Sequence, residues 1–303
     1  MRKFGLIAGT EEIDLTTQTL FFYQPDGLGY EQNLSYRRVG RKWILLDRYE
    51  EQGEISGTLI FMGKNPYSQY KSFTYKTHRT NLKLTYTMDN GTTMYYRDVI
   101  ISSIGKTELN LGGYLECPIT FKASTPWYTE LTYITKPTSM TNNHGWVWET
   151  YSTWAGSTAD QTAGIQFKSV PDMTISIDIK TRIASPCALL IRGPISSPIW
   201  THSHGGKEIA TGRINYTIPA NHFLVVDNRT APYSIKIFGE RSDGAVDYDN
   251  EVANVYAESD FSTDRFLELR NGTNTIEVVS SKPEELSNKI LVGVEANIYH
   301  ATV

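Results

Sequence analysis

The chain has 303 residues, of which 12% are aromatic, and its formal net charge at pH 7 is −4. A chain of this length suits two domains better than one. The small acidic charge argues against a dedicated nucleic-acid-binding protein, which usually carries a basic surplus.

Short apolar runs alternate with turns through the first fifty residues. The runs lie at residues 4–8, 20–23 and 43–46. Short runs rich in Ile, Tyr and Phe between turn residues are typical of strands. Pro25 favours a turn after the second run, and Gly27 supplies the positive φ that such a turn needs.

A long polar stretch occupies residues 27–40 and continues into Arg41 and Lys42. Together with Arg37 and Arg38, these residues place four cationic side chains close together in the sequence. Burying unpaired charges is unfavourable, so this stretch is too polar to be part of a core. We interpret it as an extended hairpin that leaves the domain.

One helix is predicted, over residues 66–79. Asn65 is a candidate N-cap, and Pro66 occupies the first helical position, where a missing N–H breaks no helical hydrogen bond. Four residues recur at three- and four-residue steps and so mark one face of a helix: Tyr67, Tyr70, Phe73 and Thr77.

Strand patterns resume after this helix, and Asn90 followed by Gly91 is a strong hairpin signal. We place a first domain at residues 1–130, a linker rich in Thr, Ser, Asn and Pro at 131–145, and a second domain at 146–303. Short strands separated by turn residues predict a β-sandwich for the second domain. The expected fold class is therefore all-β with one notable α-helix.

No residue pattern in the sequence predicts catalysis. His202 and His204 would share one side of an extended segment, but no third ligand follows at a known zinc spacing, and we interpret them as polar loop residues. The acidic segment at residues 243–251 lacks the central glycine of a calcium loop and is interpreted as a solvated loop. We expect no metal, no cofactor and no enzymatic activity.

Tryptophans are the strongest candidates for contact residues. Trp146, Trp148 and Trp154 cluster after the linker, and Trp200 follows in the second domain. Exposed aromatic rings anchor protein interfaces and stack on sugars, whereas buried rings only pack. Core packing, protein contact and glycan contact therefore stay open for all four residues.

Cys117 and Cys187 fall one in each expected domain. Disulfide frameworks use several closely spaced cysteines, so two buried free thiols are the better interpretation. We expect no secretory signal, because Glu11 and Glu12 follow too short an apolar run, and no run is long enough for a membrane span. These features suit assembly in a reducing cytoplasm.

The order of these parts resembles the N-terminal domain of the distal tail proteins of long-tailed bacteriophages. The most specific piece is an apolar strand that ends in Pro126, Trp127 and Tyr128. The other matching pieces lie at residues 23–29, 55–61, 67–77, 90–91 and 95–99. The second domain is similar to the galectin-like β-sandwich of the same family through residues 190–195, 221–228 and 266–276.

This resemblance implies a structural protein of the phage virion. It implies a homohexameric ring at the tail tip, or baseplate, assembled in the host cytoplasm, with N-terminal β-sandwich or split-barrel domains around a channel. Residues 30–42 match the place where such proteins send a hairpin to the neighbouring subunit. The resemblance thus implies four oligomer-interface residues: Arg37, Arg38, Arg41 and Lys42.

The implied partners are other copies of the chain and other tail proteins, namely the major tail protein, a tail-associated lysin or tail fibre, and the receptor-binding protein. Neither a membrane nor a specific nucleic acid is expected. The galectin-like fold does not itself imply sugar binding. The sugar-binding strings of galectins are absent, since Phe223 and Leu224 follow His222, and Thr201 follows Trp200.

The leading hypothesis is therefore a tail-tip hub that joins the tail tube to the host-adsorption apparatus. One alternative is a carbohydrate-binding module that assists adsorption to the host cell wall, which Trp146 and Trp148 keep open. The other is a cell-wall hydrolase, which would need a pair of carboxylates in a cleft.

Overall fold

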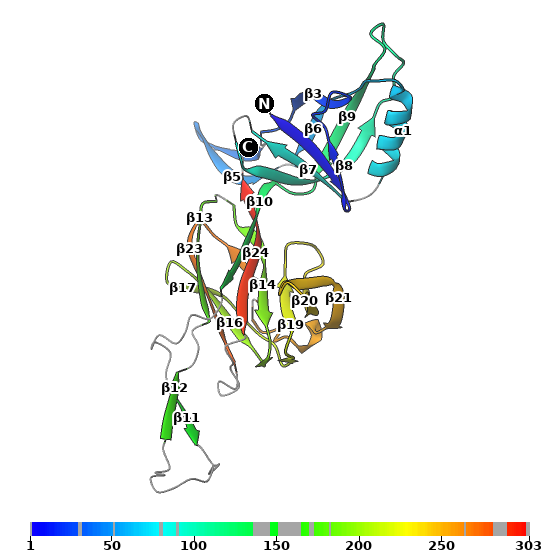
Figure 1. Ribbon diagram of the computed structural model, residues 1–303. Coiled ribbons are helices and arrows are strands. Elements are labelled where there is room, and N and C mark those ends of the chain that lie inside the picture. The colour runs from blue at the N-terminus through cyan, green and yellow to red at the C-terminus, as the bar shows by residue number, and fades with distance from the viewer. Residues whose placement is uncertain are drawn as a thin grey trace. The chain divides into compact units, whose positions relative to one another are not determined.

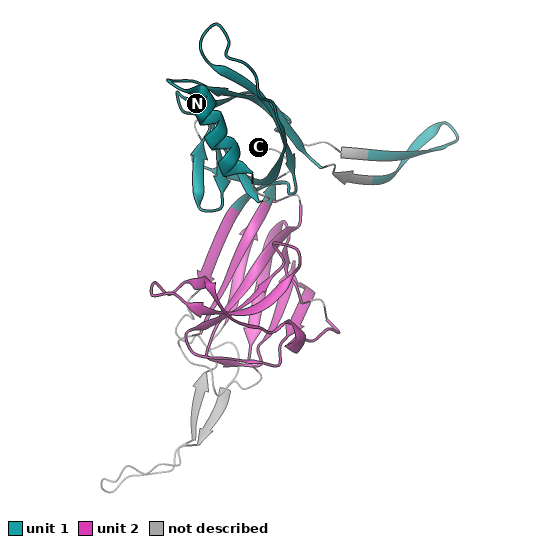
Figure 2. Cartoon of the chain, turned by 90° about the vertical axis from the view of Figure 1, so that its right-hand side faces the viewer, with its two compact units in different colours: residues 1–129, 299–303 teal, residues 130–298 magenta. Residues whose placement is uncertain are grey.

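The computed structural model describes residues 2–29, 32–50, 52–78, 81–88, 91–135, 146–150, 165–169, 173–181, 183–263, 265–280 and 290–300. These residues form an all-β protein with one α-helix, which confirms the expected fold class. The chain divides into two compact units (Figure 2). Unit 1 holds residues 1–129 and 299–303, and unit 2 holds residues 130–298. No helix within the described ranges is long and apolar enough to cross a membrane.

Unit 1 is built on a bent antiparallel sheet in which β8 forms the corner (Figure 1). The first half of β8 pairs with β7 and its second half pairs with β9, with a register shift between Ile101 and Ser103. The strand order is thus β2-β1-β7-β8 on one side and β8-β9-β6-β3 on the other. The strands are β1 (Lys3–Ala8), β2 (Glu11–Asp14), β3 (Leu20–Asp26), β6 (Glu54–Phe61), β7 (Leu82–Thr87), β8 (Met94–Ile104) and β9 (Leu115–Ala123).

Alternate residues of these strands form the core of unit 1, because successive side chains of a strand point to opposite faces. Leu6 pairs with Leu84, and both are fully buried. Leu59 pairs in the same way with Cys117 across β6 and β9. The alternate apolar residues of these strands are therefore the residues that form the core of unit 1.

The helix α1 (Pro66–Thr77) packs against β6. Asn65 accepts a hydrogen bond from the backbone N–H of Ser68, which confirms the predicted N-cap. Phe73 and Thr77 are buried, and the Phe73 ring lies 5.7 Å from the ring of Phe61. The predicted helix is confirmed, but it ends at Thr77, two residues before the predicted end, with His78 as its C-cap.

Unit 2 is a sandwich of two antiparallel sheets, with strand orders β10-β24-β14-β19-β20-β21 and β13-β23-β16-β17. The first sheet consists of β10 (Trp127–Thr135), β14 (Ser185–Arg192), β19 (His222–Asp227), β20 (Ser234–Glu240), β21 (Val246–Asn254) and β24 (Leu291–His300). The second consists of β13 (Thr174–Ile179), β16 (Ile199–His204), β17 (Lys207–Arg213) and β23 (Gly272–Val279). The remaining short elements are β15 (Ile195–Ser196), β18 (Thr217–Ile218), β22 (Glu268–Leu269) and the 3-10 turn η1 (Tyr256–Glu258).

The two sheets of unit 2 share one apolar core. Leu189 and Leu224 of the first sheet meet Trp200 and Ile276 of the second, and all four are fully buried. Cys187 belongs to the same core, so both cysteines are buried free thiols, as predicted. Burial raises the pKa of the Cys187 thiol, which makes it a poor nucleophile.

The domain boundaries differ in detail from those expected. Strand β10 continues to Thr135, so the expected linker at 131–145 begins inside a strand. Tyr299 and His300, at the end of β24, belong to unit 1. A further two-stranded sheet pairs β11 (Trp146–Thr150) with β12 (Ile165–Ser169).

Candidate interaction surfaces

The predicted hairpin is present as a separate two-stranded arm, but it spans residues 32–50 and includes the apolar run at 43–46 that was expected to form a separate strand. It consists of β4 (Gln32–Val39) and β5 (Lys42–Glu50), which pair with each other and with no other strand of the described chain (Figure 2). Gly40 has a φ of +63° and occupies the first position of a two-residue turn with Arg41, as tight hairpin turns require. We call this hairpin the arm.

The arm exposes more apolar surface than its sequence suggested. Side chains of directly paired residues share a face, so Tyr36 and Leu45 lie beside Arg38 and Trp43 on one face. Trp43 is 66% exposed, the highest value among the large apolar residues of the arm. The other exposed apolar residues of the arm are Leu34, Tyr36, Val39, Ile44, Leu45 and Leu46. Contiguous exposed apolar surface marks interaction sites.

The four expected interface cations all lie on this arm. Arg37 pairs with Ile44, so it faces away from Trp43, and Lys42 pairs with Val39 on that same second face. The Nε–H of Arg38 donates a hydrogen bond of 3.0 Å to the Gly40 carbonyl, which holds that side chain along the turn. The charges of the arm are thus visible in the sequence, whereas its exposed apolar face is not, because residues 43–46 have the pattern of any strand.

A second surface of unit 1 is a pocket of about 650 Å³ at the beginning of β3 and of β1. Its buried walls are Phe4, Leu15 and Phe22, and half of the Tyr23 side chain is exposed beside them. The remaining lining residues are Arg2, Thr16, Thr17, Gln18, Phe21, Gln24 and Pro25. The pocket is mostly apolar, with polar groups at its edge, which is the usual composition of a binding pocket.

The tryptophan predictions have different outcomes. Trp200 is 0% exposed and donates its indole N–H to the Arg265 carbonyl at 2.9 Å, so it is a core residue, and its assignment as a partner or glycan contact is corrected here. Gly212 in the paired strand leaves the space that the Trp200 ring fills. Trp146 and Trp148 lie on β11, of which the backbone alone is described, and Trp154 lies outside the described residues.

The histidine pair also lies in a strand rather than a loop. His202 is 0% exposed in β16, and its Nε2 lies 3.2 Å from the Asn274 side-chain oxygen, whereas its Nδ1 has no hydrogen-bond partner. Burial lowers the pKa of His202. His204 instead contacts the Asn271 carbonyl. Within the described part of the chain, no group of three His, Cys, Asp or Glu side chains is placed to hold a metal ion.

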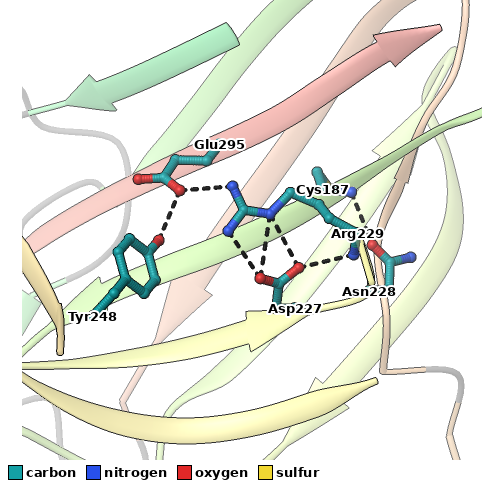
Figure 3. Close-up of polar contacts among 6 residues, drawn as sticks. All are labelled: Cys187, Asp227, Asn228, Arg229, Tyr248 and Glu295. Atoms are coloured by element: carbon teal, nitrogen blue, oxygen red, sulfur yellow. Dashed lines mark hydrogen bonds and ion pairs between the residues drawn. The ribbon is translucent and has the colours of Figure 1, made fainter. Parts of the chain in front are cut away.

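The outer face of the first sheet of unit 2 carries a network of charged groups (Figure 3). Arg229 forms a two-pronged ion pair with Asp227, at 2.8 Å, and a second ion pair with Glu295, at 2.7 Å. The hydroxyl of Tyr248 donates a 2.7 Å hydrogen bond to the same Glu295 carboxylate. The side chains of Arg229, Asp227 and Glu295 are each about four-fifths buried.

This network joins strands β19, β21 and β24. Burial alone would lower the pKa of Arg229, but the hydrogen bond with Asp227 and the surrounding negative charge outweigh burial and raise it. Burial and the bond to Glu295 raise the pKa of Tyr248. Arg229 therefore stays a cation and Tyr248 stays protonated near neutral pH. The network has the character of a structural clamp and not of an acid–base pair.

An aromatic cluster surrounds Arg265 at another surface of unit 2. The guanidinium carbon lies 5.0 Å from the ring centre of Tyr256 and 4.3 Å from that of Phe261. Phe266 joins the same cluster and packs against Tyr233. Phe261 and Tyr233 are largely exposed. Aromatic rings beside arginine are the side chains that most often anchor protein interfaces.

These features define a class of protein: an all-β protein of two compact units, the first of which carries an apolar hairpin arm. Residues 3–124 match the family model for the distal tail protein, N-terminal domain. These residues therefore form a distal tail protein N-terminal domain, which confirms the resemblance stated for the first part of the chain.

Two solved structures are similar to the chain over almost its entire length. A chain of the phage P2 baseplate in its activated, calcium-bound conformation is 18% identical, with a TM-score of 0.63, and each chain covers 100% of the other. The distal tail protein of phage SPP1, described as a paradigm of the hub adsorption apparatus of phages that infect Gram-positive hosts, is 9% identical, with a TM-score of 0.56 and coverages of 97% and 98%. No curated protein matches the sequence.

Proposed function

We propose that this protein is the baseplate hub of a long-tailed phage, a homohexameric ring at the tail tip that joins the tail tube to the receptor-binding apparatus. The observation that carries the proposal is the arm, which belongs to the family domain and exposes Trp43, Ile44, Leu45 and Leu46 on strand β5. A hairpin with unpaired edges and apolar faces is prone to associate with other chains. The likeness to the phage P2 baseplate chain and to the SPP1 hub protein supports the same role.

The arm is the proposed connector between subunits of this ring. An arm that contacts a different surface of the next subunit makes a head-to-tail interface, and such interfaces form a ring where the rotation between subunits closes. The cations Arg37, Arg38, Arg41 and Lys42 add charge to this contact. Exposed ion pairs contribute only about 0–1 kcal/mol each, so the apolar face supplies most of the stabilisation.

The test of this proposal is the mass of the protein in solution with and without the arm. Replacing residues 32–50 by a short Gly-Ser connection removes the arm while leaving every paired strand of the bent sheet in place. We expect a hexamer for the intact chain and a folded, smaller species for the shortened chain by light scattering. A hexamer that survives removal of the arm would reject the arm as connector, and a monomeric intact chain would reject the ring.

Unit 2 is proposed to dock other baseplate proteins, including the receptor-binding protein. The exposed rings of Phe261 and Tyr233 beside Arg265 support this role, as does the excess of acidic residues in the second half of the chain. Complementary charge steers association more than it strengthens it, so the aromatic rings would supply the affinity.

The docking role and the sugar-binding alternative are separated by one binding experiment on the full chain. Binding to the receptor-binding protein of the same phage, weakened by Phe261→Ala and unaffected by Tyr75→Ala on α1, supports docking. Affinity for purified host wall polysaccharide that is abolished by Trp146→Ala or Trp148→Ala would replace docking with the adsorption module.

A further inference from the structure

The pocket of unit 1 has no assigned occupant. It lies where the chain folds back after β2, and the backbone N–H of Phe22 donates to the Leu15 carbonyl at 2.8 Å to hold its two sides together. Three of its apolar walls are buried in the core of unit 1, so the pocket is a fixed part of the fold. We propose that it receives the apolar face of the arm from a second copy of the chain, an inference that rests on the proposed ring.

The size and composition of the arm match those of the pocket. A volume of about 650 Å³ is too large for one aliphatic side chain and is in the range that holds a drug-sized group, roughly 300–1,000 Å³. Trp43, with Tyr36 and Leu45 on the same face, is a cluster of that kind. Burying an indole against Tyr23, which is half exposed, and Phe21, which is partly buried, removes apolar surface from water on both partners.

Charge complementarity favours the arm over a neutral apolar segment. Asp14 and Asp26 are exposed and directly adjoin the pocket residues Leu15 and Pro25 in the chain. The arm carries Arg38 on its apolar face and Arg41 at its turn, so the two surfaces carry charges of opposite sign. Arg2 also lines the pocket, and an arginine side chain can stack on an aromatic ring.

The backbone beside the pocket supplies an independent observation. Gln24 has a φ of +47°, a conformation that residues other than glycine rarely adopt, at a register shift between Tyr23 and Asp26. Pro25 follows Gln24. The sequence predicts a turn at this point, and the structure instead has a bulge within β3. Strained backbone is found where a surface is shaped for binding. The bulge turns Tyr23 and Gln24 toward the pocket that they line.

The test is disulfide cross-linking between copies of the full chain. Leu45→Cys places a thiol on the apolar face of the arm and leaves Trp43 intact, and Gln18→Cys places one at the exposed edge of the pocket. The native cysteines are buried and do not compete. With oxidised glutathione as the oxidant, the double variant should give cross-linked species up to the size of the ring. A mixture of the two single variants should stop at dimers.

Two controls decide between outcomes. Leu45→Cys combined with Tyr75→Cys, on the exposed face of α1, should give no cross-link above background. Light scattering is measured on every variant, so a ring that assembles without cross-linking overturns the pocket assignment and leaves the proposed function standing. A chain that stays monomeric overturns both. A cross-link from Leu111→Cys, on a fully exposed loop residue, in place of Leu45→Cys would assign the pocket to that loop and also overturn the proposal.

Discussion

Trp43 lies directly across the arm from Arg38, so an exposed indole ring and a guanidinium share one face of a two-stranded sheet. Tyr36 and Leu45 form the next pair on the same face. Tryptophan and arginine are the residues that most often dominate the energy of an interface. The apolar face of the arm is therefore expected to determine assembly, and its charges to modulate it.

Replacing Trp43 by alanine should lower the mass of the protein in solution. Truncating a central interface tryptophan weakens a contact by about 2 kcal/mol or more. The fold itself should change by less than about 0.5 kcal/mol, because Trp43 is exposed within one chain. Light scattering reports the mass and a thermal melt reports the fold. Tyr75→Ala, on a side chain that is 85% exposed, is the matched control, and equal losses in both variants would contradict a special role for the arm.

The fourfold variant Arg37→Ala, Arg38→Ala, Arg41→Ala and Lys42→Ala should weaken assembly less than Trp43→Ala does. Each exposed ion pair contributes about 0–1 kcal/mol and is screened by salt. The wild-type chain should lose part of its assembly when salt is raised from low concentration, and the fourfold variant should lose that salt response. If the mass in solution changes neither with salt nor with the four substitutions, apolar packing alone supplies the affinity between subunits.

Arg229→Ala should destabilise unit 2. It leaves Asp227 and Glu295, which are each about four-fifths buried, without their cation. Removing one partner of a largely buried pair costs about 2–4 kcal/mol, since the remaining carboxylates lose water without compensation. Arg241→Ala removes an ion pair whose side chains are more than half exposed and should cost less than about 0.5 kcal/mol. Urea unfolding of the two variants measures the difference, and equal midpoints would refute the clamp.

Unit 2 should lose stability in mild acid because of His202. Burial lowers its pKa in the folded state below the ordinary value of 6.5, so the unfolded chain binds more protons. Above pH 6.5, where His202 is neutral in both states, the free energy of unfolding of unit 2 has its full value. As the pH falls below 6.5, this free energy decreases by at most about 1.4 kcal/mol per pH unit. Urea unfolding at pH 7.5 and 5.5 tests this.

The control for this pH dependence is a second histidine. Burial also lowers the pKa of His300, which belongs to unit 1. His202→Gln keeps a donor for Asn274 and should remove the acid sensitivity of unit 2, whereas His300→Gln should leave it. The expectation is wrong if His202→Gln unfolds with an unchanged dependence on pH.

The local features of the fold could be predicted from the sequence where one short-range signal decides the structure. Asn65 and Pro66 determine the start of α1, and Gly40 determines the turn of the arm. The acidic segment at residues 243–251 has the composition of a solvated loop, yet most of it lies in strand β21. Pairing with β20 holds this strand in place despite its charge. That pairing depends on residues outside the segment, so the local sequence pattern of residues 246–254 does not predict it.

The interaction surfaces were harder to predict because the type of a residue does not determine whether its side chain is exposed to solvent. Trp200 and Trp43 are both tryptophans within short strands, yet one fills the space beside Gly212 in the core and the other projects from an unpaired hairpin. The charges of the arm could be found from the sequence, since four cations in a short stretch exclude a core. The pocket required the fold, because Phe4, Leu15 and Phe22 meet only through the pairing of separate segments.

Thr129, where the chain leaves unit 1, and His300, where it has returned, lie 3.0 Å apart between the threonine hydroxyl and the imidazole Nε2. Unit 2 is thus an insertion whose entry and exit are neighbouring positions on β10 and β24, the two strands whose residues are divided between the units. A domain inserted in this way can be lengthened, decorated or exchanged for another without opening the host domain, since only the two crossing strands must be kept. Exchange of unit 2 for another domain at these two strands should therefore leave the fold of unit 1, and the arm that it carries, unchanged.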